Sequence, residues 1–345
     1  DSEQHSYFVD HYIELPTDLS QVLFIATVND LSTVSRPLLD RMEIIEVSSY
    51  TKNEKLHIAK EHLVPKQLGK NGLTAKQLRF SDKALESMID GYTREAGVRS
   101  LEREIAKVCR KAVRQLYHGN GELNEEVKSI RITDKNLKDF LGKVKFKPEN
   151  IHKKNEVGIV RGLAWTSVGG DTLQIEVNVM PGKGEIMLTG QLGDVMKESA
   201  RTGISYIRSV SRDYQIADDF FEKHDIHVHI PEGAVPKDGP SAGITMATAM
   251  LSAITEQKVR ADIAMTGEVT LRGRVMAIGG LKEKLLAAKN AGIKTVLVPK
   301  KNLADVEELS QEITKGLEIL PVEHMEEVLK AAFVSEDQDK ISGGE

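Results

Sequence analysis

The spacing of apolar residues changes once along the chain, and this change limits the folds that the chain can adopt. Between residues 47 and 143, apolar residues recur every three or four positions, which is the spacing of amphipathic helices. From residue 158 to residue 334, short apolar runs alternate with amphipathic stretches, as in chains that fold into a sheet covered by helices. The pattern predicts a mixed α/β protein, in which a helical bundle is followed by an α/β domain.

The stretch between these two patterns, "KFKPENIHKKNEVG", is polar and rich in lysine. Because polar segments between periodic ones are typical of loops, we interpret residues 144–157 as an interdomain linker. The last residues, 335–345, are also polar and lack the apolar side chains that a packed core requires. We expect this tail to be disordered.

Capping residues mark two helix starts in residues 47–143. Thr51 precedes a helical pattern and Glu54 follows three positions later, which is the spacing of a capping box. Ser81 precedes a second amphipathic stretch. Further helices are predicted over "GVRSLEREIAKVCRKAVRQLY" and "TDKNLKDFLG", so we expect a bundle of about four helices.

The first part of the chain, residues 1–46, contains one strand-like segment. The sequence "QVLFIATVND", residues 21–30, is a nearly continuous apolar run of the kind found in buried parallel strands. Since so short a region offers no partner strands, it cannot form a sheet domain by itself. We interpret residues 1–46 as the end of a larger domain.

Composition excludes several classes of protein. The 345 residues carry a net charge of −5, which gives no general attraction to nucleic acid or to an anionic membrane. No stretch approaches the roughly 20 apolar residues that span a bilayer. The single cysteine, Cys109, excludes an internal disulfide framework, and its place in a helical pattern favours a buried structural residue.

The stretch "PKDGPSAGITMA" places Ser241 between a turn and an apolar helical run. Serine is a favoured helix cap, because its oxygen accepts a hydrogen bond from a free N–H group of the first turn. The same position suits a nucleophile, because the N–H groups of a helix start stabilise developing negative charge. The residues alone leave both interpretations open, with the cap as the commoner one.

Three histidines lie close together in "HDIHVHIPEG": His224, His227 and His229. A metal site is conceivable, since residues two apart on a strand share one face. No acidic or cysteine ligands with metal-site spacing accompany them, so we expect no metal. A Ser-His-Asp triad that pairs Ser241 with His227 or His229 stays open, because triads occur in any chain order.

A lysine is the stronger partner for Ser241. The stretch "GGLKEKLLAAKNAG" places Lys282 and Lys284 in the first turn of a predicted helix. Burial lowers the pKa of a lysine, and a neutral amine can take the proton of a serine hydroxyl. Lys282 shares its direction on the helix with Lys289, whereas Lys284 lies beside small residues that permit close packing. The helical wheel therefore favours Lys284.

Several long segments resemble one protein family. The sequences "DIHVHIPEGAVPKDGPSAGITMATA", "MTGEVTLRGRVMAIGGLKEKLLAA" and "GLAWTSVGGDTLQIE" resemble the proteolytic domain of the ATP-dependent Lon proteases. Upstream, "LFIATVN", "PLLDRMEII" and "YTREAGVRSLERE" resemble the end of the Lon AAA+ module. The resemblance covers nearly all of residues 1–333. It implies the end of an AAA+ large subdomain in residues 1–46, the helical AAA+ small subdomain in 47–143, and a Lon-type protease domain in 158–334.

The resemblance assigns roles in the protease domain. It implies Ser241 as nucleophile and Lys284 as general base, a Ser-Lys dyad. It also implies that Thr266 helps to hold these two residues together and that Asp238 shapes the approach to the site. Glu176, His227 and His229 match family positions near the site and are expected to support it.

The resemblance also assigns nucleotide-sensing residues. Asn29 matches the sensor-1 asparagine, Arg41 the arginine finger and Arg99 the sensor-2 arginine. The basic residues after Arg99 are interpreted as a solvated helix face. Because the sequence contains no GxxxxGK[ST] motif, we expect no ATP hydrolysis and no cofactor for this chain, with ATP and Mg²⁺ used by the intact protein.

The implied function is a serine endopeptidase that degrades unfolded or damaged proteins, with ATP hydrolysis driving the intact homo-hexamer. We expect this chain to keep at most ATP-independent peptidase activity. Two alternatives are a non-catalytic Lon-like assembly scaffold and a nucleic-acid-binding module, with weak DNA binding as a side activity. No membrane partner is expected. The expected location is a bacterial-type cytoplasm, with an organelle matrix as the alternative.

Overall fold

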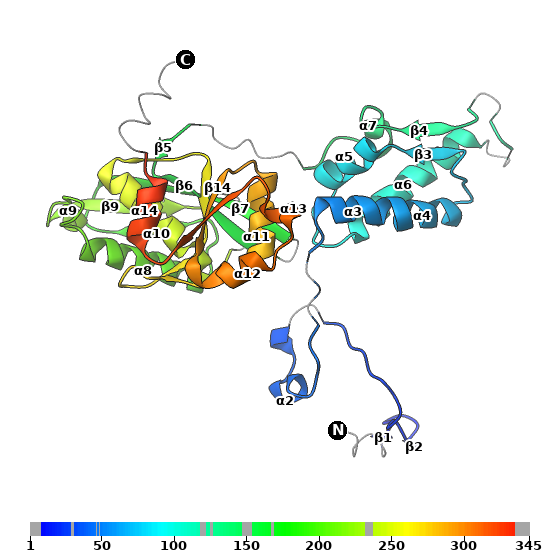
Figure 1. Ribbon diagram of the computed structural model, residues 1–345, viewed down its shortest axis with the longest axis horizontal. Helices are drawn as coiled ribbons and strands as arrows, with labels where there is room; N and C mark the ends of the chain where they lie inside the picture. The colour runs from blue at the N-terminus through cyan, green and yellow to red at the C-terminus, as the bar shows by residue number, and fades with distance from the viewer. Residues whose placement is uncertain are drawn as a thin grey trace. The chain divides into compact units, whose positions relative to one another are not determined.

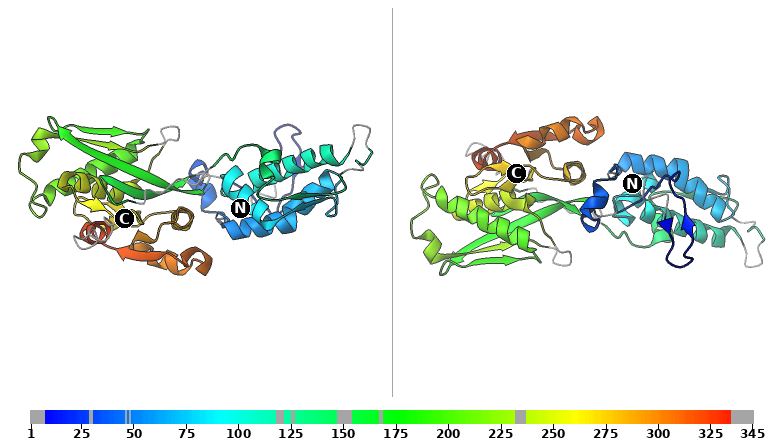
Figure 2. Two further views of the ribbon diagram at one scale, coloured as in Figure 1. Left: turned by 90° about the horizontal axis from the view of Figure 1, so that it is seen from above. Right: turned by 90° about the horizontal axis from the view of Figure 1, so that it is seen from below.

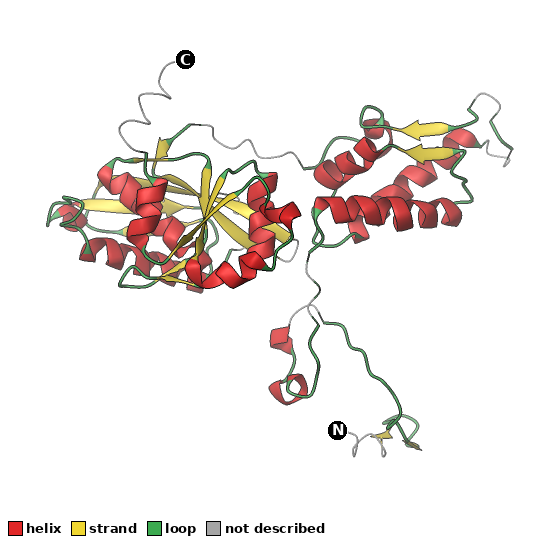
Figure 3. Cartoon of the chain, viewed as in Figure 1, coloured by secondary structure: helices red, strands yellow, loops and turns green. Residues whose placement is uncertain are grey.

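The computed structural model forms two compact units, Asp1–Ser48 and Ser49–Glu345 (Figure 1). It describes residues 8–28, 31–45, 47, 49–117, 122–124, 127–146, 154–166, 169–231 and 237–334. The mixed α/β fold class predicted from the sequence is confirmed, because helices and strands both make up the described residues (Figure 3). The predicted domain boundaries stay predictions, and the predicted disordered tail lies outside the described residues.

The first unit has little regular structure. Its described elements are β1 (Phe8–Val9), β2 (Pro16–Thr17), η1 (Leu31–Thr33) and α2 (Arg36–Leu39). The predicted buried strand is wrong: residues 21–28 form no strand, and Leu23 and Ile25 expose more than four-fifths of their surface, at 84% and 83%. Apolar runs become buried strands only where neighbouring strands pair with them, and no described strand pairs with this one.

The helical part of the second unit begins at the predicted caps. Thr51 accepts a hydrogen bond from the backbone N–H of Glu54 at 3.1 Å, and the Glu54 carboxylate accepts one from the N–H of Thr51 at 2.6 Å. Ser81 caps its helix through the N–H of Ala84 at 3.1 Å. Both predicted caps are confirmed. The helices are α3 (Lys52–Ile58), the π-helix η2 (Ala59–Leu63), α4 (Val64–Lys70), α5 (Asp82–Tyr92), α6 (Arg99–Leu116) and α7 (Leu137–Leu141).

Helix α6 buries the apolar face that its sequence predicts. Leu101, Ile105 and Val108 are fully buried in the core of the helical part. Its basic residues point outward, as expected: Arg103, Arg110, Lys111 and Arg114 are exposed, and Lys107 is half-buried. A parallel pair of strands, β3 (Leu78–Phe80) and β4 (Ile130–Ile132), was not predicted, because three residues are too few to show a period.

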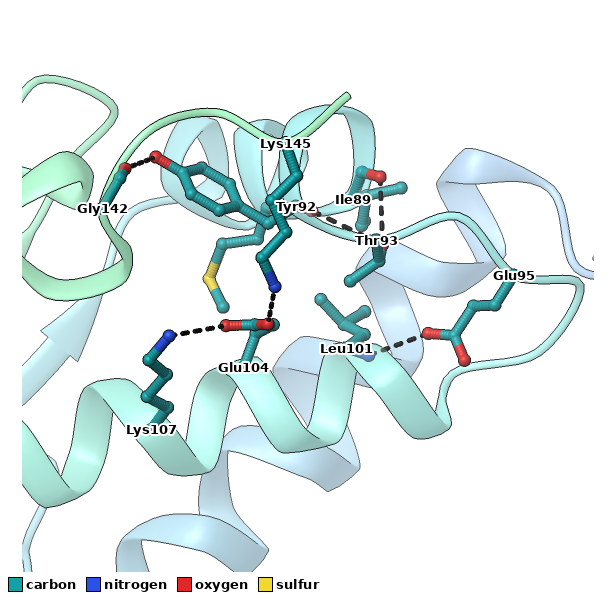
Figure 4. Close-up of polar contacts among 10 residues, drawn as sticks. Ile89, Tyr92, Thr93, Glu95, Leu101, Glu104, Lys107, Gly142 and Lys145 are labelled. Atoms are coloured by element: carbon teal, nitrogen blue, oxygen red, sulfur yellow. Dashed lines mark hydrogen bonds and ion pairs between the residues drawn. The ribbon is translucent and has the colours of Figure 1, made fainter. Parts of the chain in front are cut away.

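The segment after α7 is bound to the helical part (Figure 4). The hydroxyl of Tyr92 donates to the carbonyl oxygen of Gly142 at 2.9 Å, and Lys145 forms an ion pair with Glu104. The backbone N–H groups of residues 145 and 146 both donate to the carbonyl oxygen of Gly91. The first residues of the predicted linker are therefore hydrogen-bonded to α5 and α6.

The α/β part is built on a seven-stranded mixed sheet with the order β15-β14-β11-β6-β7-β9-β8. Strands β11, β14 and β15 run parallel to one another and β11 runs parallel to β6, whereas β7 is antiparallel to both of its neighbours. The β6–β7 hairpin is drawn green in Figure 2. The strands are β6 (Ile159–Thr166), β7 (Gly169–Pro181), β8 (Ile186–Thr189), β9 (His224–His229), β11 (Ile263–Met265), β14 (Thr295–Pro299) and β15 (Glu318–Val322).

Two hydrophobic cores lie on the two faces of this sheet. Ile263 and Met265 of β11 belong to the core that contains α8 (Asp194–Ser209), α10 (Gly243–Thr255) and α14 (Met325–Ala332). Ala264, between them, belongs to the core that contains α11 (Leu281–Asn290). Successive side chains of a strand point to opposite faces, so α10 and α11 cover opposite faces of β11.

Shorter elements complete the α/β part. They are β5 (Glu156–Val157) paired with β10 (Lys258–Val259), β12 (Glu268–Val269) paired with β13 (Val275–Met276), α9 (Phe220–Lys223), η3 (Pro240–Ala242), η4 (Lys300–Asn302), α12 (Leu303–Glu307) and α13 (Gln311–Thr314). In the described part of the chain, no helix combines the length and the apolar character that crossing a membrane requires.

Candidate active site

The carboxyl ends of β11 and β14 bring two helix starts to one edge of the sheet. Gly267, just after β11, donates its N–H to the carbonyl oxygen of Ser241 at 2.8 Å and accepts a bond from the N–H of Ile244 at 3.1 Å. Asn302, just after β14, binds both the N–H and the carbonyl of Ile278, which precedes α11. Ser241 and the first turn of α11 therefore lie at the same edge, where open α/β sheets usually place their sites.

Ser241 is not a helix cap. It lies inside η3, whose N-cap is Gly239, and the N-cap of α10 is Ala242; neither cap makes a side-chain bond. Within the described residues, the hydroxyl of Ser241 has no hydrogen-bond partner. The commoner interpretation from the sequence is therefore wrong, and the hydroxyl is free for chemistry.

Thr266 fixes the backbone of Ser241. Thr266 is fully buried, and its hydroxyl donates to the carbonyl oxygen of Ser241 at 3.3 Å. Together with the N–H of Gly267, it gives that carbonyl two donors. Both donors come from the residues that directly follow β11, so the strand end determines where Ser241 lies.

Lys284 is the buried lysine of α11. Only 2% of its surface is exposed, and burial lowers its pKa from the ordinary 10.5 to about 8, although the neighbouring Glu283 carboxylate opposes the change. Ala287 and Ala288 are buried beside it, as the helical wheel predicts. Lys282 is only half-buried, so the choice of Lys284 as the buried member of the pair is confirmed.

Two glycines allow α11 to pack closely enough to bury Lys284. A Cβ atom at Gly170 of β7 would lie 1.9 Å from the carbonyl oxygen of Glu283. At Gly280, where φ is +66°, a Cβ would lie 2.8 Å from the ring of Trp165. Side chains at either position would push the first turn of α11 away from the β6–β7 hairpin. The role of Gly170 could not be predicted from the sequence, because only the fold shows which helix packs against it.

Ser241 and Lys284 are not hydrogen-bonded to each other in the described part of the chain. They belong to elements that cover opposite faces of the sheet and meet at its edge. Without substrate, catalytic hydrogen bonds are often long or poorly aligned, and they tighten in the complex. The arrangement supplies an unbound hydroxyl and an amine of lowered pKa at one edge, and these two groups must come together before a proton moves.

Asp238 binds α8 and not Ser241. Its carboxylate accepts hydrogen bonds from the N–H of Met196 at 3.0 Å and from the N–H of Gly239 at 2.9 Å. Met196 lies in the first turn of α8, so Asp238 acts as a helix cap supplied from a distant loop. This contact anchors the loop that leads to Ser241.

His227 and His229 share one partner, Thr189, which was not predicted from the sequence. The hydroxyl of Thr189 on β8 lies 2.9 Å from Nε2 of His227 and 2.7 Å from Nδ1 of His229. Glu176 is the cross-strand neighbour of His229 and accepts a bond from Gln174 at 2.8 Å. The register of β8 beside β9 places Thr189 here, and this register is invisible in the sequence.

The described contacts give little support to a histidine triad or a metal centre. Neither histidine is hydrogen-bonded to Ser241 in the described residues. Val228 and its neighbours on the opposite face of β9 are buried in the core, as an ordinary strand requires. Across the described ranges, no group of three or more His, Cys, Asp or Glu side chains is placed to hold a metal ion.

Comparison with known proteins decides the family. Residues 131–335 match the Lon protease (S16) C-terminal proteolytic domain, and residues 69–127 match the Lon protease AAA+ ATPase lid domain. The chain belongs to the Lon protease family. The matched proteolytic domain is a serine endopeptidase domain, in agreement with the resemblance found in the sequence.

Lon proteases from three bacteria are among its relatives. The Lon protease of Lachnoclostridium phytofermentans is 60% identical over 97% of this chain and 45% of its own length. The Lon protease of Clostridioides difficile is 54% identical over 98% of this chain and 42% of its own length. Lon protease 1 of Bacillus subtilis is 54% identical over 97% of this chain and 43% of its own length. The chain spans less than half the length of these relatives.

Two of the three residues that match Lon nucleotide sensors lie in the described part of the chain. Asn29 lies outside the described residues, and Arg41 is an exposed residue of the first unit. Arg99 is exposed at the start of α6, where it lines an open pocket of about 350 Å³ with Gln67, Glu102, Arg103 and Ala106. A carboxylate, that of Glu102, lines this pocket, and the sequence has no P-loop motif. The residues that line the pocket therefore do not by themselves fit a nucleoside triphosphate with its Mg²⁺.

Proposed function

We propose that Ser241 and Lys284 form the catalytic dyad of a Lon-type serine endopeptidase. The observation that carries the proposal is the burial of Lys284, which lowers its pKa to about 8, at the sheet edge where the hydroxyl of Ser241 is unbound. A lysine with an ordinary pKa of 10.5 would be almost fully charged at neutral pH and could not accept a proton. At about 8, roughly a tenth of the molecules carry the neutral amine at pH 7.

The chemistry follows from these two groups. The neutral amine of Lys284 takes the proton of the Ser241 hydroxyl, and the oxygen attacks the carbonyl carbon of a peptide bond. A backbone N–H group of the turn just before α10 stabilises the oxyanion. The Lys284 ammonium then gives its proton to the leaving amine as the peptide bond breaks. Water, deprotonated by the same amine, attacks the acyl group, and the proton returns to Ser241.

The other site residues support this dyad. Thr266 fixes the backbone of Ser241, and Asp238 anchors the preceding loop to α8. We assign His227, His229 and Glu176 to a polar surface beside the site that contacts the substrate and takes no proton from Ser241. An extended substrate would bind by main-chain pairing with a strand edge, which explains tolerance of many sequences.

The whole protein is proposed to act on unfolded or damaged polypeptides. The match to an AAA+ lid domain supports ATP-driven unfolding by the longer protein, assembled as a homo-hexamer. Arg41 and Arg99 would sense nucleotide there, together with Asn29. The bacterial sources of its relatives support a location in a bacterial cytoplasm.

Replacing the nucleophile tests the proposal. Ser241→Ala should abolish cleavage of a fluorogenic peptide and of an unfolded reporter protein by the 345-residue chain. Ser205→Ala is the control, because Ser205 is an exposed serine of α8 whose hydroxyl, among the described residues, binds only the carbonyl of Arg201. Parental cleavage rates in Ser241→Ala would refute the assignment of the nucleophile.

A further inference from the structure

Both peptide groups that flank Ser241 have fixed orientations. On its carboxyl side, the carbonyl of Ser241 is bound by Thr266 and Gly267. On its amino side, the carbonyl of Pro240 accepts the N–H of Gly243 and the hydroxyl of Ser199, whose oxygen lies 3.3 Å away. Ser199 belongs to α8 and is 7% exposed. A buried side chain from a distant helix thus binds the peptide that carries the N–H of Ser241.

The direction of that N–H follows from the planarity of the peptide. The structure has no cis peptide bonds among its described residues, so the Pro240–Ser241 peptide is trans. In a trans peptide, the carbonyl and the N–H point in opposite directions. Because the carbonyl of Pro240 points to Ser199, the N–H of Ser241 points away from α8. No described residue accepts a hydrogen bond from this N–H.

The contact between the two helices leaves little freedom for this peptide to turn. A Cβ atom at Gly243 would lie 2.8 Å from the oxygen of Ser199. One turn further along each helix, a Cβ at Gly203 would lie 3.4 Å from the Cβ of Ala247. Small residues four apart therefore bring α8 against the start of α10. The hydroxyl of Ser199 lies directly at the turn that carries the nucleophile.

We propose that Ser199 is a positioning residue for peptide hydrolysis: its hydroxyl holds the Pro240 carbonyl so that the N–H of Ser241 faces the oxyanion. The inference rests on the proposed function of Ser241. Ser199 touches no reacting atom and acts through the peptide plane. The oxyanion exists only after attack on the substrate, so the N–H contributes to the transition state and not to substrate binding.

The kinetic consequence is specific. Ser199→Ala removes one neutral hydrogen bond, and we expect kcat for a fluorogenic peptide to fall about 3- to 10-fold, with KM changed less than twofold. A peptidyl boronic acid, which forms a tetrahedral adduct with the Ser241 oxygen, should bind more weakly by a similar factor. A purely structural role would lower the amount of folded protein without weakening the adduct in the molecules that remain folded.

The experiment compares four variants of the 345-residue chain. Ser205→Ala makes the same chemical change on α8 away from the loop and should keep parental kcat and boronate affinity. Ser199→Cys preserves the shape of the side chain but donates only weakly, so its kcat should also fall, even where Ser199→Ala folds poorly. Ser241→Ala tests the proposed function separately.

The outcomes distinguish the two proposals. If Ser241→Ala is inactive while Ser199→Ala and Ser199→Cys keep parental kcat and boronate affinity, the positioning role is wrong and the nucleophile assignment stands. A rise in KM alone would also contradict the positioning role. If Ser241→Ala remains active, the proposed function itself fails, whatever the Ser199 variants show.

Discussion

Gly170 on β7 lies directly against Glu283 in the first turn of α11, where a Cβ atom would be 1.9 Å from the Glu283 carbonyl oxygen. The residue next to Glu283 is Lys284, so this contact brings the proposed base down onto the sheet. The absence of a side chain at Gly170 thus determines how completely Lys284 is buried from water. Proton transfer at neutral pH depends on that burial.

Gly170→Ala should raise the pKa of Lys284, so that less of the neutral amine is present at neutral pH. The added methyl group moves the first turn of α11 outward, water reaches Lys284, and its pKa rises toward 10.5. The acid limb of the pH profile of kcat/KM should therefore move to higher pH, with activity at pH 7 reduced at least tenfold. Gly279→Ala is the control, since a Cβ there meets no atom of the described residues within 4 Å. An unmoved acid limb in Gly170→Ala would show that the contact is not needed.

Lys284→Met should stabilise the fold at neutral pH. The unfolded chain protonates this lysine near pH 10.5 and the folded chain only near 8, so between these values the unfolded state binds more protons and the parental unfolding free energy rises with pH. The unfolding free energy of Lys284→Met should therefore exceed that of the parent by about 3 kcal/mol below pH 8. The difference should vanish near pH 10.5.

This stability difference can be measured by urea unfolding at several pH values, followed by fluorescence. Trp165, the single tryptophan, lies against Gly280 beside α11 and reports on this region. Lys282→Met serves as the matched control, because Lys282 is only half-buried. A difference between Lys284→Met and the parent that does not depend on pH would mean that folding does not lower the pKa of Lys284.

Thr266→Val should lower kcat with little change in fold. Valine has nearly the shape of threonine, so the fully buried site stays filled, but the bond to the Ser241 carbonyl is lost. We expect kcat for peptide cleavage to fall roughly tenfold. Thr248→Val is the control, since the hydroxyl of Thr248 is equally buried but binds the carbonyl of Ile244 within α10. Equal kcat values for the two variants would argue against a role for Thr266.

Thiol reagents should leave the activity unchanged. Cys109 is fully buried in α6, and burial raises its pKa to about 11, so almost no thiolate forms at pH 8. Native protein treated with iodoacetamide at pH 8 should show no modification by mass spectrometry and no loss of peptidase activity, whereas protein unfolded in urea should be alkylated. Rapid native alkylation accompanied by inactivation would implicate a cysteine.

Much of the fold could be predicted from local sequence signals. The caps at Thr51 and Ser81, the buried face of α6 and the alternation along β9 are properties of neighbouring residues, and each is confirmed. The strand pair β3–β4 escaped prediction because its strands are three residues long. The apolar run at residues 21–28 was wrongly predicted to be a buried strand: such a strand needs neighbours, and no described strand pairs with these residues.

The candidate site was predictable only in part. The burial of Lys284 followed from the small residues beside it on the helix, whereas Ser241 as nucleophile came from resemblance to a family. Thr189, Gly170 and Ser199 could not be found, because each acts through a partner far away in the sequence. Strand register and helix packing bring these residues to their partners, and a local sequence pattern predicts neither of them.

The most direct test of the central claim is the pH profile of kcat/KM for peptide hydrolysis by the parent, Lys284→Arg and Lys282→Arg. If Lys284 deprotonates Ser241, the parent and Lys282→Arg should gain activity with an apparent pKa of about 8. Lys284→Arg should be inactive at every pH, because arginine stays charged. Activity in Lys284→Arg with the parental pH profile would contradict the account and return the histidines to consideration as the base.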